Sequence, residues 1–412
     1  MTTTDLAKQD NGRSSSLEQR IADVGGHLGS SLVAVLGELP EGEMGPQRLA
    51  RALGLDKVLM SRLLKAVRSA DPIAVAYHAP GPEPLRRFLK AAKAGGAKAA
   101  SVKTGLAAVD AFDDLIRGEA GDRSSLTAMI SAWLPEARFE FELRRKQAAY
   151  RAMSELKGVS ARVNLSTVIL HPTGDGAMLD VVWLSGLLGV TRLRPDAPIK
   201  ITTRRFADAT EERRPETLSG QPIEDIAGLR LDEFCQATPA ELEVREVNGV
   251  FQYLMAGSDF GPKSATDLLL AEVNRAEMPD SVPKGSGRKG FVFSGLGTPS
   301  RTMVFDVLLH RDVYAGSEPE LYLYDTRLDG LADVNDPTRD IDRFDSSETI
   351  QVMGRGLGRF RSPAVARYPE MLAHVFTSMS WDESEFRGYR VVIEYPIYGS
   401  QVVAAFTAPE AD

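Results

Sequence analysis

The sequence predicts an α+β protein with a helical N-terminal part and a β-rich C-terminal part. Up to residue 157 the apolar residues recur at helical spacing, and glycine or proline separates one such run from the next. After Gly158 the apolar runs become short, rich in Val, Ile, Tyr and Phe, and bounded by Gly, Pro and Asp, which is the pattern of strands. A chain of 412 residues is also longer than one core usually serves, so two or three domains are expected.

Composition narrows the class of protein. No stretch reaches the ~20 uninterrupted apolar residues that a membrane helix needs, so no membrane partner is expected. Residues 1–15 are polar and lack the apolar centre of a signal peptide, which predicts a disordered lead-in and a cytoplasmic protein. Cys235 is the single cysteine and the five histidines are scattered one by one, so neither a disulfide nor a bound metal or other cofactor is expected.

Charge is shared unevenly along the chain. The first 100 residues contain 14 Lys and Arg against 10 Asp and Glu, and the remaining residues contain 35 against 47. A weakly basic N-terminal part followed by an acidic remainder suits a protein whose N-terminal part binds a polyanion.

Three helices are predicted in order near the N-terminus. The first covers residues 16–37, with Ser16 as candidate N-cap. Pro46 opens a second, short helix, which Gly54 ends. The third runs from its candidate cap Asp56 to about residue 69. The apolar run at residues 73–78 is strand-like, and a Pro/Gly loop follows it.

The second and third helices have the pattern of a helix-turn-helix, in which two short helices cross closely around a glycine turn. Ala50 is the small residue at the crossing, Gly54 lies in the turn, and five leucines with one methionine supply the apolar anchors: Leu49, Leu53, Leu55, Met60, Leu63 and Leu64. The outer face of the third helix would then carry Lys57, Ser61, Arg62 and Lys65, side chains able to bind phosphates and base edges.

At these residues the chain resembles the winged helix-turn-helix domains of IclR-type and MarR-type bacterial transcription regulators. The run PQRLARALGLDKVLMSRLLKAV is similar to the IclR-type Leu-Ala helix, Leu-Gly-Leu turn and Ser-Arg-Leu-Leu recognition helix. The resemblance covers residues 16–80 and implies that Lys57, Ser61, Arg62 and Lys65 contact DNA. It departs from the family in the wing, where YHAPGPEP replaces the usual strand, and it does not extend to an effector domain.

Residues 81–157 are predicted to be a helical connector of three or more amphipathic helices. Gly95-Gly96 and residues 118–121 separate them, and Pro135 marks a helix start or a kink. The last helix, Leu134 to Leu156, is long and heavily charged. We expect it to be the element through which the chain forms a homodimer.

Residues 158–412 are expected to form a β-rich effector or interaction domain. Strand-like runs cover 162–170, 177–184, 199–206, 241–247, 250–256, 290–296, 302–314, 320–326, 389–395 and 401–407. Two helices are predicted among them, over residues 264–276 and 366–379.

Signals of catalysis in this part are weak. His171 and His310 each precede an acidic residue within a few positions, but a packing or surface role is favoured for both. The acid-rich stretch 329–345 fails the calcium-loop template, because Thr338 stands where that template requires glycine, so a solvated surface loop is expected. Aromatic residues gather after position 320, where they fill a β core or line a ligand pocket.

Together these features predict a DNA-binding transcription regulator that binds double-stranded DNA as a homodimer and senses a small-molecule effector or a partner protein through its C-terminal domain. Two alternatives stay open. In the first, the C-terminal domain is an enzyme and the winged helix serves dimerisation, which a pocket holding His171 or His310 against a carboxylate would support. In the second, the chain is a non-catalytic interaction or scaffold protein.

Overall fold

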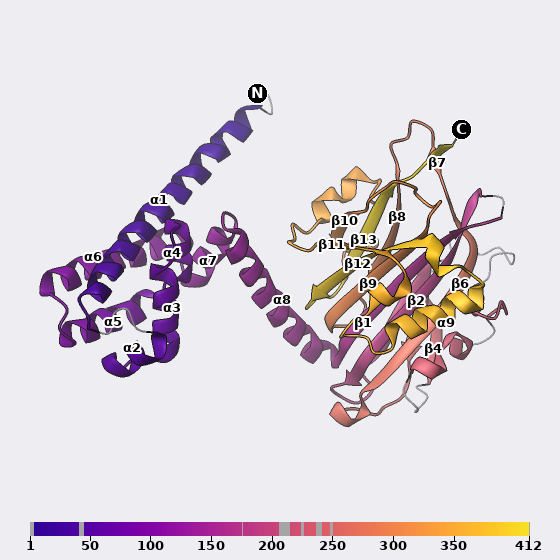
Figure 1. The fold of residues 1–412 in the computed structure, drawn as a ribbon, viewed down its shortest axis with the longest axis horizontal. Helices are drawn as coiled ribbons and strands as arrows, with labels where there is room; N and C mark the ends of the chain where they lie inside the picture. Colours follow the sequence, from indigo (N-terminus) through magenta and orange to yellow (C-terminus); the bar gives the residue numbers. More distant parts are fainter. Residues whose placement is uncertain are drawn as a thin grey trace. The chain divides into compact units, whose positions relative to one another are not determined.

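The computed structural model describes residues 4–40, 45–174, 176–205, 215–223, 226–235, 241–247 and 250–411. The chain forms two compact units, one up to Glu142 and the other from Leu143, and each is described here by itself (Figure 1). Helices make up the first unit and strands dominate the second, which confirms the α+β class. Among the described helices, none combines the length and the apolar character needed to cross a membrane.

The first unit is built from helices alone in its described residues. The helices are α1 (Thr4–Gly37), α2 (Pro46–Leu53), α3 (Lys57–Val67), α4 (Pro72–His78), α5 (Pro82–Ala94), α6 (Ala99–Leu115), the π-helical turn η1 (Ile116–Ala120), α7 (Arg123–Ser131) and α8 (Pro135–Lys157), within which the boundary between the two units falls. Proline opens four of these helices, α2, α4, α5 and α8, where its missing N–H costs no hydrogen bond.

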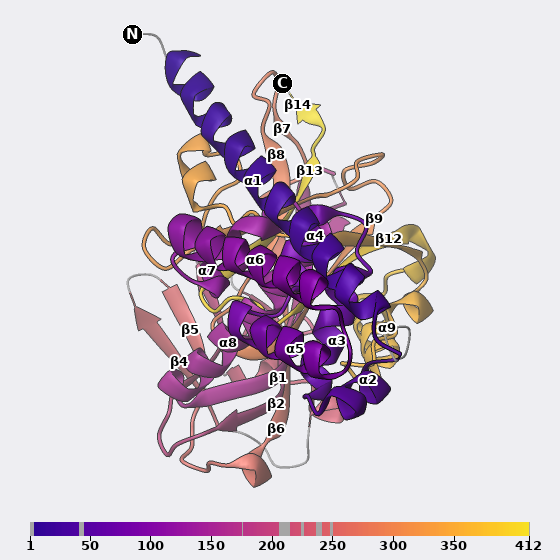
Figure 2. The ribbon, with the colours of Figure 1, turned by 90° about the vertical axis from the view of Figure 1, so that its left-hand side faces the viewer.

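One core joins all of α1 to α7, and α1 lies at its centre against α4 and α6 (Figure 2). The close approach of α1 to α4 depends on Gly25, because a Cβ there would lie 2.1 Å from the carbonyl oxygen of Pro72. Buried residues of α5 and α6, such as Phe88 and Phe112, share this core with Leu32 and Met60. The helices expected as a connector from residue 81 onward therefore pack with the preceding ones in a single unit.

The predicted strand at residues 73–78 is wrong, since these residues form α4. Pro72 stands in the first turn, and the Asp71 carboxylate accepts a hydrogen bond of 2.8 Å from the Ile73 amide, so both start a helix. Val75, Ala76 and Tyr77 are buried in succession, which a helix enclosed by α1, α3 and α7 permits. No strand occurs in the described residues of this unit, so the expected wing is absent there.

The predicted helix start at Ser16 is corrected as well, whereas residues 1–3 of the predicted lead-in lie outside the described residues. The helix α1 begins at Thr4, and Ser16 lies inside it. The first proline of the chain is Pro40, so nothing before it breaks the helix. Adding a turn to an existing helix is far easier than nucleating one, and the packed part of α1 supplies that nucleus.

The second unit contains fourteen strands in its described residues. They are β1 (Val159–Pro172), β2 (Met178–Arg192), β3 (Ile199–Arg205), β4 (Leu242–Val247), β5 (Val250–Met255), β6 (Thr266–Pro279), β7 (Val282–Pro283), β8 (Lys289–Gly295), β9 (Ser300–His310), β10 (Glu320–Asp325), β11 (Ile350–Arg355), β12 (Phe386–Glu394), β13 (Ser400–Thr407) and β14 (Glu410–Ala411). Each predicted strand overlaps one of them, although residue 206 lies outside the described residues.

A six-stranded sheet in the order β11-β12-β9-β1-β2-β6 is the centre of this unit. Its middle pair, β1 and β9, is parallel, and its other neighbours are antiparallel. Helix α9 (Tyr368–Met379) and the 3-10 turn η6 (Leu357–Phe360) share a core with one face. Strands β8 and β13 of the sheet β10-β13-β8 share a core with the other face, so the unit has three layers (Figure 1). The helix predicted at residues 366–379 is confirmed as α9.

The helix predicted at residues 264–276 is wrong, because this segment is strand β6. Residues 268 to 274 are all buried. Leu269, Ala271 and Val273 join the core beneath α9, whereas Leu268 and Leu270 join a separate core with β3 and β5. A strand covered on both faces carries apolar residues on both, so the alternation that marks a strand disappears from the sequence.

A buried ion pair crosses the α9 side of the central sheet. Asp306 on β9 is fully buried and Arg390 on β12 is 5% exposed. The guanidinium donates from Nε and Nη2 to the carboxylate at 2.8 and 2.7 Å. Tyr368 on α9 donates to the same carboxylate at 2.7 Å, and Thr167 on β1 lies 2.6 Å from the Tyr368 hydroxyl. Burial raises the pKa of Asp306, and the hydrogen bonds from Arg390 oppose that shift.

Replacing Arg390 with Met leaves the Asp306 carboxylate buried without its counter-charge. We expect R390M to lower the free energy of unfolding of the second unit by about 3–5 kcal/mol. Urea unfolding followed by fluorescence in a Trp133→Phe background measures this, because the two remaining tryptophans lie in the second unit. The control is Arg288→Met, which removes an exposed ion pair with Asp333 and should cost below about 1 kcal/mol. Equal losses for the two variants would contradict the role given to the buried pair.

Candidate functional site

The helix pair α2–α3 has the internal packing that the sequence predicted. Gly54 ends α2 in the left-handed conformation, with φ 63° and ψ 34°. The Asp56 carboxylate caps α3 by accepting hydrogen bonds from the Val58 and Leu59 amides at 2.7 and 3.2 Å. Buried residues of both helices hold the two together: Leu49, Ala50, Leu59, Met60, Leu63 and Leu64. Only three residues separate the helices, so their crossing is tightly constrained.

The opposite face of α3 is open. Lys57, Ser61, Arg62 and Lys65 are all exposed, as predicted. Val58 lies among them with 65% of its surface exposed. These positions follow the 3.6-residue period of the helix, so they form one polar stripe with a single apolar member.

Two of these cations have contacts within the first unit. Lys65 Nζ lies 3.5 Å from the Glu140 carboxylate, and Arg62 Nη2 donates a long hydrogen bond of 3.4 Å to the Ala79 carbonyl. Both pairs are exposed or half-buried and at the outer limit of hydrogen-bond length, so they restrain the side chains only weakly.

The surroundings of α3 are basic. Residues 45–80 contain six Lys or Arg and two Asp, and both aspartates, Asp56 and Asp71, are helix N-caps. Arg48, Arg51 and Arg68 are exposed and form no ion pair within the described part of the chain. Their positive charge is therefore available to an outside partner.

The end of α4 is held by a half-buried arginine that sequence analysis did not single out. Arg123 on α7 donates from Nη2 to the carbonyl oxygens of Ala76, Tyr77 and Ala79 at 2.7, 2.7 and 3.1 Å. Burial lowers the pKa of Arg123 to about 10. The bonds fix α4, which packs against α3, in the place where a wing was expected. Arg86 on α5 binds Asp110 and Asp113 on α6 at 2.8 and 2.9 Å.

In the second unit the structure brings two scattered histidines together. His171 at the end of β1 and His310 at the end of β9 have ring centroids 4.9 Å apart, because these parallel strands are neighbours. His310 Nε2 lies 3.1 Å from the Glu385 carboxylate. The His171 ring is stacked on Trp381 at 4.8 Å, and its Nδ1 donates to the Pro172 carbonyl at 2.7 Å.

This histidine cluster has the groups of a general acid–base pair, a histidine oriented by a carboxylate. The surroundings favour a packing role, because aromatic rings enclose the imidazoles: Phe386 lies 5.5 Å from His310 and 6.0 Å from His171. Burial is the main cause that lowers the pKa of His171, and the neighbouring His310 lowers it further. Glu385 and Trp381 could not be paired with the histidines from sequence, since they follow α9 about 70 positions after His310.

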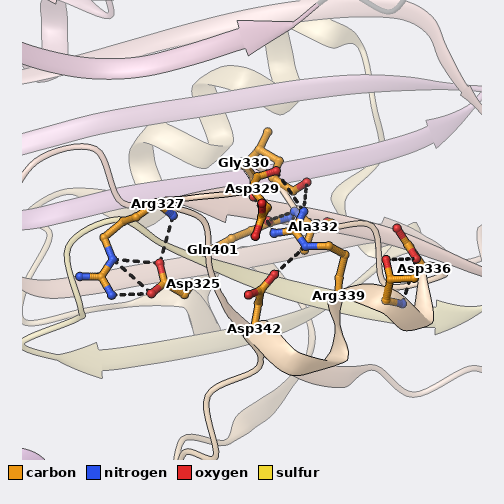
Figure 3. Close-up of polar contacts among 11 residues, drawn as sticks. Asp325, Arg327, Asp329, Gly330, Ala332, Asp336, Arg339, Asp342 and Gln401 are labelled. Atoms are coloured by element: carbon orange, nitrogen blue, oxygen red, sulfur yellow. Dashed lines mark hydrogen bonds and ion pairs between the residues drawn. The ribbon is translucent and has the colours of Figure 1, made fainter.

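Arg339 binds several oxygens of the acid-rich stretch 329–345 (Figure 3). Arg339 donates to the carbonyl oxygens of Asp329, Gly330 and Leu331 at 3.3, 2.9 and 3.0 Å, and to the Asp342 carboxylate at 2.7 Å. A guanidinium thus occupies the point where these oxygens converge. Among the described residues, no set of three or more His, Cys, Asp or Glu side chains could hold a metal ion.

A cavity of about 380 Å³ lies between α9, β6 and the segments 217–219 and 228–231. Its lining includes the imidazole of His374, the guanidinium of Arg230 and the hydroxyls of Ser219 and Ser378. This volume falls in the range of small-molecule sites, roughly 300–1,000 Å³, and the lining mixes these polar residues with apolar ones such as Leu218, Leu229 and Leu231.

Comparison of the chain with protein-family models, curated proteins and solved structures gives no match. The resemblance of residues 16–80 to winged-helix regulators therefore stays a prediction from the sequence pattern.

The lowered pKa of His171 predicts a pH dependence of stability. An unfolded histidine titrates near pH ~6.5, so below that pH the unfolded chain binds a proton that folded His171 resists, and the second unit loses stability as pH falls. We expect His171→Gln to reduce the loss of the urea midpoint between pH 7 and pH 5. The matched control is His374→Gln, an exposed position on α9. An unchanged pH slope in H171Q would refute this assignment.

Proposed function

We propose that the chain is a DNA-binding transcription regulator and that α3 is the helix that enters the major groove of double-stranded DNA. The observation that carries the proposal is the division of α3 into two faces. One is buried against α2 and the rest of the core, and the other presents Lys57, Ser61, Arg62 and Lys65 to solvent. A helix held by its neighbour and exposing cations and a hydroxyl suits contact with phosphates and base edges.

The four side chains should contribute unequally. Lys57 has no ion pair among the described residues and stands in the first turn of α3, the end that reaches bases in helix-turn-helix proteins. Lys65 must first leave Glu140, and this exchange reduces its net contribution. Lys57 and Arg62 are therefore the main expected contacts. Since no strand accompanies the pair in the described residues, additional phosphate contacts would come from Arg48 and Arg51 on α2.

One such module contacts a half-site, so a homodimer supplies the second half of a palindromic operator. The cavity beside α9, lined by both polar and apolar residues, supports a small-molecule effector as the signal. The enzyme alternative draws support from the His310–Glu385 contact, and the aromatic rings packed around it favour the regulator.

Selection from random-sequence DNA pools should enrich a palindromic site, with an affinity that falls steeply as salt rises. On that site we expect Lys57→Ala and Arg62→Ala each to weaken binding about tenfold and to reduce the salt slope by about one unit. Lys103→Ala is the control, because this exposed lysine lies on α6, which packs against α1 and α5. No enrichment, or equal effects at Lys103 and Arg62, would overturn the proposal.

A second variant tests the role of the acidic neighbour. Glu140→Gln keeps a side chain able to accept the hydrogen bond from Tyr77 but removes the charge that faces Lys65. We expect E140Q to tighten DNA binding about two- to fivefold, since Lys65 becomes free to pair with phosphate. The gain should vanish in the double variant E140Q/K65A. A gain that persists in the double variant would show that Glu140 acts other than through Lys65.

A further inference from the structure

Strand β4 is an open edge. It is the outer strand of the three-stranded sheet β3-β5-β4, and in the described part of the chain it pairs with β5 alone. Every side chain from Glu243 to Val247 is exposed, including Val244 at 45%. The pairing with β5 is regular, with no bulge, and β4 contains no proline. Such an edge is a template for a further strand unless something covers it.

The pairing of β4 with β5 determines which residues of β4 direct their backbone N–H and C=O groups outward. Ala256 donates to the Glu241 carbonyl at 2.8 Å, and these two residues continue the β4–β5 register. Alternate residues of an antiparallel strand direct their N–H and C=O to the same neighbour. Odd-numbered positions of β4 therefore bond to β5, whereas Leu242, Val244 and Glu246 direct their N–H and C=O groups outward.

We propose that two copies of this chain pair through β4, antiparallel, with Val244 of one copy opposite Val244 of the second copy. Leu242 of each copy then lies opposite Glu246 of the other. These three pairs are all outward-facing positions and supply about six main-chain hydrogen bonds. The two sheets join into one of six strands, and the Val244 pair extends the face that carries Tyr253 on β5.

The charges of Glu243 and Arg245 favour this register over the registers shifted by two residues. Glu243 and Arg245 lie on one face of β4, 3.0 Å apart and both exposed. In the proposed register each Glu243 faces Arg245 of the second copy, twice by symmetry, at positions where side chains approach most closely. A shift of two residues in one direction sets Glu243 against Glu243, and in the other direction Arg245 against Arg245. Opposite charges are thus satisfied only with Val244 on the symmetry axis.

This inference deepens the homodimer of the proposed function by placing it at β4 instead of α8. The β4 dimer rests on the proposed function only for the reason why the chain would dimerise. Its existence can be tested without DNA. Loss of the β4 dimer and failure to bind an operator are therefore separate results.

The test is sedimentation of the full chain over a range of concentrations. We expect the unsubstituted protein to form a dimer and Glu243→Arg or Arg245→Glu each to weaken it at least tenfold, because both cross-copy pairs become repulsive. The double variant E243R/R245E restores the opposite pairing and should return to within about threefold of the original dissociation constant. Val244→Pro should yield a monomer, since it removes the central outward N–H without touching the β5 ladder.

Arg355→Glu is the matched control, because Arg355 is exposed on β11, the edge of the six-stranded sheet. Circular dichroism and thermal unfolding verify that each variant folds. A protein that is monomeric throughout, a dimer unaffected by V244P, or a double charge exchange that fails to restore the dimer would each overturn the proposal.

Discussion

The ion pair between Asp306 and Arg390 is the interaction on which the second unit depends. Both charges are buried at the centre of a sheet, and their desolvation costs free energy that only complete hydrogen bonding offsets. The carboxylate is bound by Arg390 and Tyr368, and the guanidinium also binds the carbonyls of Phe360 and Arg361 at 2.8 and 3.0 Å. One network therefore sets the positions of β9, β12, α9 and the turn η6, and with them the strand ends that carry the histidine cluster.

Other arginines likewise bind several backbone carbonyl oxygens at once. Arg123 binds three carbonyl oxygens at the end of α4, and Arg339 binds three in the acid-rich loop. Arg387 binds those of His310, Val313 and Tyr314, and Arg192 those of Ala197, Met255 and Ala256. A planar guanidinium with five donors can satisfy several backbone oxygens that no regular element pairs. Many arginines of this chain are thus structural, which makes the exposed cations of α3 more informative about function.

The two proposed interaction surfaces offer different groups to a partner: α3 offers charged side chains, and β4 offers backbone N–H and C=O groups. On α3 the backbone hydrogen bonds are made within the helix and the charged side chains face outward, so a polyanion is the complementary partner. On β4 Glu243 and Arg245 pair within the strand, and alternate backbone N–H and C=O groups face outward, so another strand is the complementary partner. Each surface is held by a core behind it, which keeps its geometry fixed before any partner binds.

The sequence by itself determined the helical and β-rich halves, ten of the fourteen described strands, and the α2–α3 pair down to its glycine turn and Asp56 cap. These features are local, because caps, turns and side-chain periodicity act over a few residues. Tertiary structure decided the rest. Residues 73–78 became a helix and residues 264–276 a strand, since burial on both sides erased the periodic signal from both segments. It also paired His310 with Glu385 and Asp306 with Arg390, residues about 75 and 84 positions apart, because such contacts depend on which strands become neighbours and not on the local sequence.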